Sequence, residues 1–229
     1  MLTGANGYIG LRLIPALLEG GHRVTALVRD RRRFPANEFP GERLQVIEGD
    51  LLQPATLPDL PQDLDAAYYL VHSMSAGGDF AEKERRVAEH FSNWIDRFAC
   101  PHVIYLAGLV DENRELSPHL ASRLRVETVL RRGSAALTVL RASIIVGSGS
   151  ASFEIVRDLT EKLPVMICPR WVGTRCQPIA IRDVIAYLCG VLDVRETVGG
   201  TYDIGGPEVM RYRDLLAGYA AVSYTHLTL

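Results

Sequence analysis

The amino-acid sequence predicts an α/β protein of the Rossmann type, a doubly wound parallel sheet followed by a small, partial C-terminal lobe. Two observations predict this fold: short apolar runs alternate with amphipathic helical patterns, and a glycine-rich turn opens the chain. Repeated strand–helix–strand units imply parallel strands joined by right-handed crossovers. The apolar runs are nearly continuous, as in strands covered on both faces. We therefore expect the core in residues 1–147 and a partial lobe packed on it in residues 148–222.

Six apolar runs are the predicted strands: Val24–Val28, Leu44–Ile47, Ala66–Val71, His102–Leu106, Leu137–Arg141 and Thr201–Ile204. Helical patterns fall between them, at Ile9 to Leu18, Val87 to Phe98 and His119 to Arg131, with apolar residues three and four apart. In the C-terminal third we expect helices at Phe153 to Leu163, from Asp183 to Leu192 and at Arg211 to Val222. The carboxylate of Asp183 can cap the second of these, because it accepts from free first-turn amides.

The composition is that of a globular chain with little net charge. Its 229 residues include 25 Lys+Arg and 27 Asp+Glu, a formal net charge of −2. This balance argues against nucleic acid or an anionic membrane as the main partner. No apolar run approaches the ~18 residues of a membrane span, and no signal-peptide pattern opens the chain. The four cysteines form no CxxC pair, so we expect reduced thiols, no metal site and a cytoplasmic protein.

The strongest functional signal is the turn TGANGYIG, with glycines at positions 4, 7 and 10. Gly4 would permit a tight strand-to-helix turn, Gly7 the approach of backbone amides to a pyrophosphate, and Gly10 close packing of the helix on the sheet. The helix N-terminus then holds the phosphates through its amides and its dipole. A mere tight turn is the alternative, but the following helix and βα units favour the dinucleotide. The predicted cofactor-binding residues of the turn are Gly4, Asn6, Gly7, Tyr8, Ile9 and Gly10.

The residue after the predicted strand Val24–Val28 distinguishes NAD from NADP. An acidic residue about 20 positions beyond the glycines would bind the ribose hydroxyls of NAD. Arg29 occupies that place, and a guanidinium suits a 2′-phosphate, so NADP is the preferred cofactor. Asp30 follows directly, and because it is acidic, NAD remains an alternative cofactor. The basic run after it also has a plainer interpretation as a solvated loop.

The GxxGxxG spacing and the wording TGANGYIG resemble the short-chain dehydrogenase/reductase superfamily, in its extended and atypical branches. The stretches at 68–74, 140–147 and 177–184 strengthen the resemblance. Together they are similar to atypical NAD(P)H-binding proteins related to NmrA-like regulators and to the complex I accessory subunit. Bacterial proteins that carry this domain ahead of a C-terminal domain of unknown function are more similar still. The resemblance spans roughly residues 1 to 220.

The resemblance implies further cofactor contacts. Asp50 and Leu51 would contact the adenine, with a simple turn cap as the alternative role of Asp50. His72 and Ser73 follow a strand at the place where the superfamily contacts the cofactor ribose, although an ordinary polar loop is an equal alternative. Ser143 would pass the nicotinamide ring.

The superfamily's catalytic pattern is absent from the expected place. Active members use a Ser at a strand end and a Tyr and a Lys in a YxxxK pattern on the next helix. Here the strand end carries Ala107 and Gly108, and the helix carries His119-x-x-x-Arg123. His119 could replace the tyrosine as a proton donor near neutral pH. Arg123 could keep a positive charge near the ribose, but a guanidinium does not shuttle protons. Otherwise both are surface residues of the helix.

These features leave two functions open. The first is an atypical NADP(H)-dependent reductase, with NAD possible, that transfers hydride to a small carbonyl, quinone or enone. The alternative is a non-catalytic NAD(P)-sensing regulatory or assembly protein with a protein partner. Only Met1 and Leu2 precede the turn, so we expect a shortened first strand. Residues 223–229 resemble translated adapter sequence, and we expect them to be non-native.

Overall fold

A computed structural model of the chain describes residues 1–72, 80–110, 117–162 and 170–223. The chain divides into two compact units, Met1–Arg141 with Ile185–Asp203, and Ala142–Val184 with Ile204–Leu229. The boundary expected near residue 147 stays a prediction, and the tail at 224–229 lies outside the described residues.

The first unit is built on parallel strands. β1 (Val24–Val28) pairs in parallel with β2 (Leu44–Glu48), and β3 (Ala67–Tyr69) pairs in parallel with β4 (His102–Gly108). The order continues from β4 to β5 (Ala136–Ala142) and to β9 (Thr201–Ile204) at the edge. Leu2 joins the two groups through parallel bridges to Ala26 and Tyr68. The N-terminal residues therefore lie centrally, between β1 and β3, as the first strand of a Rossmann sheet does.

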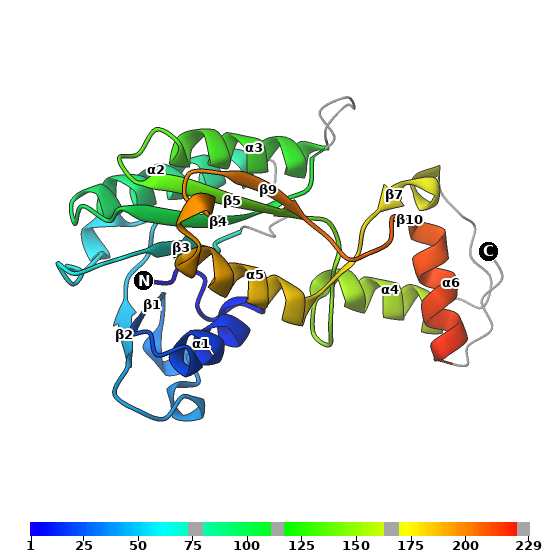
Figure 1. Cartoon of the computed structure of the whole chain (residues 1–229), viewed down its shortest axis with the longest axis horizontal. Coiled ribbons are helices and arrows are strands. Elements are labelled where there is room, and N and C mark those ends of the chain that lie inside the picture. The colour runs from blue at the N-terminus through cyan, green and yellow to red at the C-terminus, as the bar shows by residue number, and fades with distance from the viewer. Residues whose placement is uncertain (73–79, 111–116, 163–169, 224–229) are drawn as a thin grey trace. The chain divides into compact units, whose positions relative to one another are not determined.

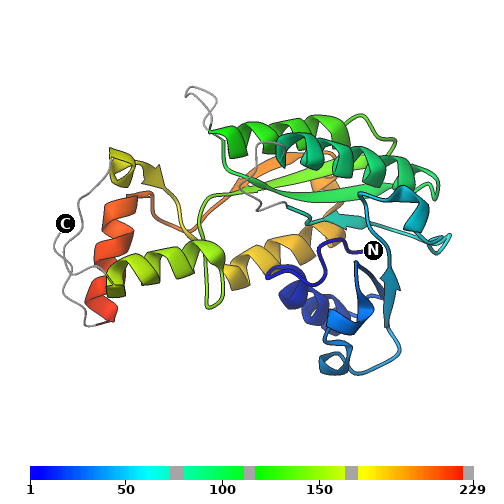
Figure 2. The same cartoon turned by 180° about the vertical axis from the view of Figure 1, so that it is seen from behind.

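Helices cover both faces of this sheet, as Figures 1 and 2 show for α2 and α3 on one face and α5 on the other. Two adjacent residues of β3 contact helices on opposite faces of the sheet, because side chains alternate along a strand. The Tyr68 hydroxyl donates to the Leu188 carbonyl of α5 (Ile181–Asp193) at 2.7 Å. The Tyr69 ring packs edge-on against Phe91 of α2 (Phe80–Asp96), with centroids 4.9 Å apart. The doubly wound α/β class is thereby confirmed.

The main core lies between the sheet and the pair of helices α2 and α3 (Pro118–Leu130). Phe91, Trp94 and Ile95 of α2 are almost fully buried in it. They lie three and four residues apart, so one helix stripe meets the sheet. Ser117 caps α3 by accepting from the Leu120 amide at 3.3 Å, and Pro118 occupies the first turn, where a missing amide costs nothing.

The first helix, α1 (Gly10–Glu19), starts directly after the glycine turn. It ends at Gly20 and Gly21, and Gly21 has a φ of 89°, the left-handed conformation that glycine adopts without strain. The β3 strand is shorter than the predicted Ala66–Val71, although Ala66 and Leu70 are buried beside it.

The second unit holds short strands and two helices. β6 (Ile145–Val146) pairs with β8 (Ile179–Ala180) in parallel, and β7 (Arg175–Cys176) pairs with β10 (Met210–Arg211) in antiparallel fashion. α4 (Ala151–Lys162) packs on α6 (Tyr212–Val222) around Val156, Val172 and Leu216. α5 begins at Ile181, so the expected cap Asp183 lies inside its first turn, where its carboxylate still faces the positive end of the helix dipole.

None of the helices in the described ranges is long and apolar enough to cross a membrane. Within the same ranges, no three histidine, cysteine or acidic side chains are grouped to hold a metal ion.

Candidate dinucleotide site

The glycine turn is held against β3 before it enters α1. The Thr3 amide and hydroxyl both donate to the Tyr68 carbonyl, at 3.0 and 2.9 Å. Gly4 then turns with a φ of 67°, and a Cβ on it would lie 2.5 Å from the Leu70 carbonyl oxygen. A Cβ on Gly10 would lie 2.4 Å from the Gly4 carbonyl oxygen. No side chain fits at either position, in keeping with the tight turn and close helix packing expected of them.

Gly7 is less confined by the protein, because its Cβ would lie 3.1 Å from the Gly4 carbonyl oxygen. Asn6 is exposed and donates from Nδ2 to the Arg33 carbonyl at 3.2 Å. Tyr8 and Ile9 are half-buried and lead into α1. The start of α1 has no side-chain cap and no acidic residue in its first turn. The helix N-terminus therefore retains the field that attracts a phosphate group.

A cleft of about 620 Å³ opens beside this turn. Residues 4–7 form one side of it, and the carboxyl ends of β1, β2 and β3 contribute Arg29, Asp50 and His72. Its size lies within the usual range for small-molecule sites. Ligands of open α/β sheets bind at this edge, where the strand order reverses. Four residues predicted from scattered positions, Gly4, Arg29, Asp50 and His72, thus meet around one cavity.

The two candidates for the ribose, Arg29 and Asp30, lie in different environments. Arg29 is exposed and lines the cleft. The Asp30 carboxylate accepts from Arg32 Nε at 3.0 Å, from Arg32 NH2 at 3.1 Å and from the Arg32 amide at 3.0 Å. These bonds from Arg32 lower the pKa of Asp30. Asp30 is occupied as the cap of a short 3₁₀ helix, Arg31–Arg33.

Asp50 both caps a turn and lines the cleft. Its Oδ1 accepts from the Leu52 amide at 2.9 Å, and its own amide donates to Thr56 Oγ1 at 2.9 Å. Leu51 is buried and Leu52 is 37% exposed, and both line the cleft beside Asp50. Asp50 therefore has the turn-capping role that was the alternative to cofactor contact. This role does not remove Asp50 from the cleft.

His72 and Arg123 meet although they are 51 residues apart in the sequence. Arg123 NH1 lies within hydrogen-bond distance of His72 Nε2, and the same nitrogen lies 3.2 Å from the Leu106 carbonyl oxygen. Burial, with a smaller contribution from the Arg123 charge, lowers the pKa of His72 to about 3. The ring is therefore neutral at physiological pH. Arg123 itself is half-buried, and the Tyr105 hydroxyl donates to its carbonyl at 3.4 Å.

Six predicted site residues in the described part of the chain are not among those that line the cleft: Tyr8, Ile9, Gly10, His119, Arg123 and Ser143. His119 is exposed on the first turn of α3, with its ring 4.8 Å from the Phe80 ring. Ser143 follows β5 and belongs to the second unit. Ser73 lies outside the described residues. The catalytic role of His119 and the cofactor contacts of Ser73 and Ser143 stay predictions.

Sequence reasoning missed the two charged cleft residues on α2, Lys83 and Glu84. Glu84 is 8% exposed and accepts from the Ser122 hydroxyl of α3. A signal for Glu84 exists in the sequence, because it stands three residues before Val87 on the apolar stripe of α2. A charged residue on a buried helix stripe indicates a polar partner across the interface.

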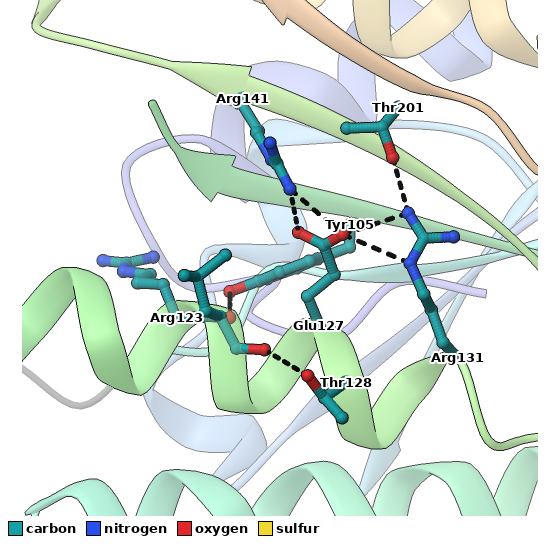
Figure 3. A network of polar contacts seen from close by, with 8 residues as sticks. Tyr105, Arg123, Glu127, Thr128, Arg131, Arg141 and Thr201 are labelled. Atoms are coloured by element: carbon teal, nitrogen blue, oxygen red, sulfur yellow. Dashed lines mark hydrogen bonds and ion pairs between the residues drawn. The ribbon is translucent and has the colours of Figure 1, made fainter. Parts of the chain in front are cut away.

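A second polar cluster, the Glu127 network, joins α3 to β5 (Figure 3). Glu127 is 7% exposed, and its carboxylate forms ion pairs with NH2 of Arg131 at 3.0 Å and with NH2 of Arg141 at 3.1 Å. Figure 3 shows these two guanidinium groups converging on the Glu127 carboxylate, while Arg123 directs its own away from it. Sequence reasoning missed this network as well, because its members come from two elements.

Comparison with known proteins decides the family. Residues 4–162, more than half of the chain, match the NAD(P)H-binding family. The chain belongs to this family. It is an atypical member of the short-chain dehydrogenase/reductase superfamily, as the resemblance of its motifs implied, and NAD(P)H is its cofactor class.

Two curated relatives are reductases by name. The chain is 24% identical over 222 residues to the chloroplastic divinyl chlorophyllide a 8-vinyl-reductase of Zea mays, covering 90% of this chain and 54% of that protein. It is 26% identical over 172 residues to the ceramide reductase of Caulobacter vibrioides, covering 72% of this chain and 52% of that protein. The chain spans about half the length of these relatives.

Solved structures share the fold. The Bordetella bronchiseptica enzyme WbmF in complex with NAD+ superposes with a TM-score of 0.78 at 16% identity, over 100% of this chain and 79% of that one. UDP-glucuronic acid 4-epimerase from Bacillus cereus, with UDP-glucuronic acid and NAD, gives 0.77 at 20% identity over 99% and 83%. Such identities establish the Rossmann-like fold alone.

Proposed function

We propose that this chain is the dinucleotide-binding part of an NADPH-dependent reductase that acts on a small carbonyl, quinone or enone. The observation that carries the proposal is the cleft beside the glycine turn, in a chain of the NAD(P)H-binding family. The chain fits the cofactor locally, because Gly4 and Gly10 leave no room for side chains where the turn must stay compact. The two relatives named as reductases support the reaction type.

The residues of the cleft have separable roles toward the cofactor. The amides of residues 4–10 and the start of α1 would hold the pyrophosphate, and Asp50 with Leu51 would meet the adenine. By its resemblance to the superfamily, Ser143 is the residue that we assign to the nicotinamide. When bound, NADPH supplies a hydride from that ring. Arg123, His72 and His119 are the groups of this chain that we assign to the reacting end.

NADPH is preferred over NADH because Arg29 faces the cleft and Asp30 does not compete for the ribose. A guanidinium binds a phosphate with charge-assisted hydrogen bonds. The Asp30 carboxylate is held by three bonds from Arg32. An Asp in that state is a poor acceptor for the ribose hydroxyls of NADH.

Calorimetric titration of the chain with NADPH and with NADH tests the cofactor assignment. Arg29→Gln should weaken NADPH binding about tenfold, the loss of one charged hydrogen bond, and leave NADH binding unchanged. Arg33→Gln, an exposed charge-matched neighbour, is the control and should change neither. Tighter binding of NADH than of NADPH overturns the NADP preference, and no binding of either dinucleotide overturns the proposal.

A non-catalytic sensing or assembly role is the second candidate, and one observation favours it. The strand end before α3 carries Ala107 and Gly108 in place of Ser, and the helix carries His119 and Arg123 in place of Tyr and Lys. NADPH oxidation in the presence of a panel of quinones and enones separates the two functions. Turnover supports the reductase, and tight NADPH binding without turnover on any member supports the sensing role.

A further inference from the structure

We propose that Arg123, positioned by the neutral ring of His72, is the group that binds the negatively charged oxygen of a substrate or reaction intermediate. The inference rests on the proposed reductase function and adds to it the chemistry of the reacting end. It assigns to Arg123 a charge-stabilising role in place of the phenol and lysine of active superfamily members.

The first observation concerns the side-chain partners of the Arg123 guanidinium. Among the described residues, no acidic side chain forms an ion pair with it, and its side-chain partner there is the His72 ring. Arg131 of α3 and Arg141 of β5, by contrast, share the carboxylate of Glu127. A half-buried cation without a counterion costs free energy that a bound anion recovers.

The second observation is the chemistry of the partner. A guanidinium has five donors and no acceptor, so a hydrogen bond with His72 requires an unprotonated Nε2. Nε2 also lies 3.2 Å from the Leu106 carbonyl oxygen, so the bond from Arg123 requires the tautomer with the ring proton on Nδ1. The neutral ring occupies one N–H of Arg123 and leaves its other donors for a ligand.

The third observation is the place of the pair. His72 lines the cleft at the carboxyl end of β3, the edge at which ligands of such sheets bind. Glu84, which lines the same cleft, accepts a hydrogen bond from the hydroxyl of Ser122, the residue before Arg123. The Tyr105 hydroxyl donates to the Arg123 carbonyl and holds the first half of α3 to β4. Three elements therefore hold Arg123 in place, and its guanidinium contacts His72, a residue that lines the cleft.

The charge-stabilising role of Arg123 follows from the movement of electrons in carbonyl reduction. Addition of a hydride to the carbonyl carbon forms a C–H bond and moves the π pair of the C=O bond onto oxygen. The oxygen becomes negative, and Arg123 donates to it in a setting partly shielded from water, where such bonds are strong. A proton from water, directly or by way of His119, completes the alcohol. Arg123 transfers no proton in this scheme.

A direct test uses acetate as an oxyanion probe and nitrogen NMR of the Arg123 Nε–H and His72 ring signals, with no cofactor. Acetate should shift both signals saturably in the wild-type protein and in Arg125→Gln, the charge-matched control on the exposed side of α3. Arg123→Gln should abolish the saturable shift at His72, and Arg123→Lys should retain it in weakened form. Equal acetate binding by Arg123→Gln, or a His72 ring that carries its proton on Nε2, overturns the proposal.

The positioning role of His72 has its own variants. His72→Gln keeps a neutral acceptor for Arg123 and should retain acetate binding, whereas His72→Leu should lose it. In turnover, Arg123→Gln should lower kcat about 100-fold, as the loss of a single oxyanion donor does, with NADPH affinity unchanged. Free guanidinium should restore part of the rate in Arg123→Gly. Unchanged kcat in Arg123→Gln overturns the proposal, whereas loss of NADPH binding by the wild-type protein counts against the proposed function.

Discussion

The two arginine clusters of α3 differ in what balances their charge. In the Glu127 network, two guanidinium groups share one carboxylate that is 7% exposed, and the ion pairs join the helix to β5. In the His72–Arg123 pair, the guanidinium has a neutral ring as its side-chain partner. A carboxylate partner uses the charge for the fold, whereas a neutral partner leaves the charge for a ligand. The proposal therefore assigns stability and ligand binding to different residues of one helix.

Removal of the shared carboxylate should have the largest effect on the fold. Glu127→Gln leaves two guanidinium groups without a counterion, one of them on Arg141 with a side chain 16% exposed. We expect the free energy of unfolding to fall by about 3 kcal/mol, measured by urea denaturation. Asp158→Asn, in the exposed pair with Lys162, is the control and should change little. Equal losses in the two variants would contradict a structural role for the Glu127 network.

Removal of one arginine at a time sharpens the comparison. Arg141→Gln should lower the free energy of unfolding by about 2 kcal/mol, because it breaks charged hydrogen bonds to a buried carboxylate. Arg123→Gln should lower it by less than about 1 kcal/mol, because the partner it leaves is neutral. The same urea experiment measures both. A larger loss for Arg123→Gln than for Arg141→Gln would reverse the assignment of the two clusters.

The pH dependence of stability should report His72. Its pKa falls from 6.5 in the unfolded chain to about 3 in the folded one, so between these values unfolding takes up a proton. Stability is therefore lost as the pH falls below 6.5, with a slope of at most about 1.4 kcal/mol per pH unit from this group. In His72→Gln this part of the slope should vanish. Identical slopes in both proteins between pH 4 and 6 would show that His72 titrates normally.

His119 should have the smallest effect. Its ring is exposed, so His119→Ala should leave the free energy of unfolding within about 0.5 kcal/mol of the wild-type value. Its effect on NADPH oxidation should be smaller than that of Arg123→Gln. Where an exposed ring can donate the proton, water can also reach the oxygen and donate it. Steady-state rates with the same quinone or enone compare the two variants. A greater loss in His119→Ala would make proton donation the main requirement of the reaction.

Much of the fold, and several of the residues that line the cleft, could be predicted from the sequence. The apolar runs of β1 and β4 and the stripe of α2 depend on local periodicity, which the sequence displays directly. The turn at Gly4 and Gly10 can also be predicted from the sequence, because only glycine fits at these two positions. The length of β3 and the start of α5 were less accurate, since element ends depend on neighbouring strands and loops.

The sequence by itself determined the α/β class, the glycine turn and the candidate residues at the strand ends, because each depends on contacts within a few residues. Only the tertiary structure decided which charges are balanced. It brought His72 to Arg123 across 51 residues and placed the Glu127 carboxylate between Arg131 and Arg141. A guanidinium is the same in every sequence, and its role depends on what packing places within about 3 Å of it.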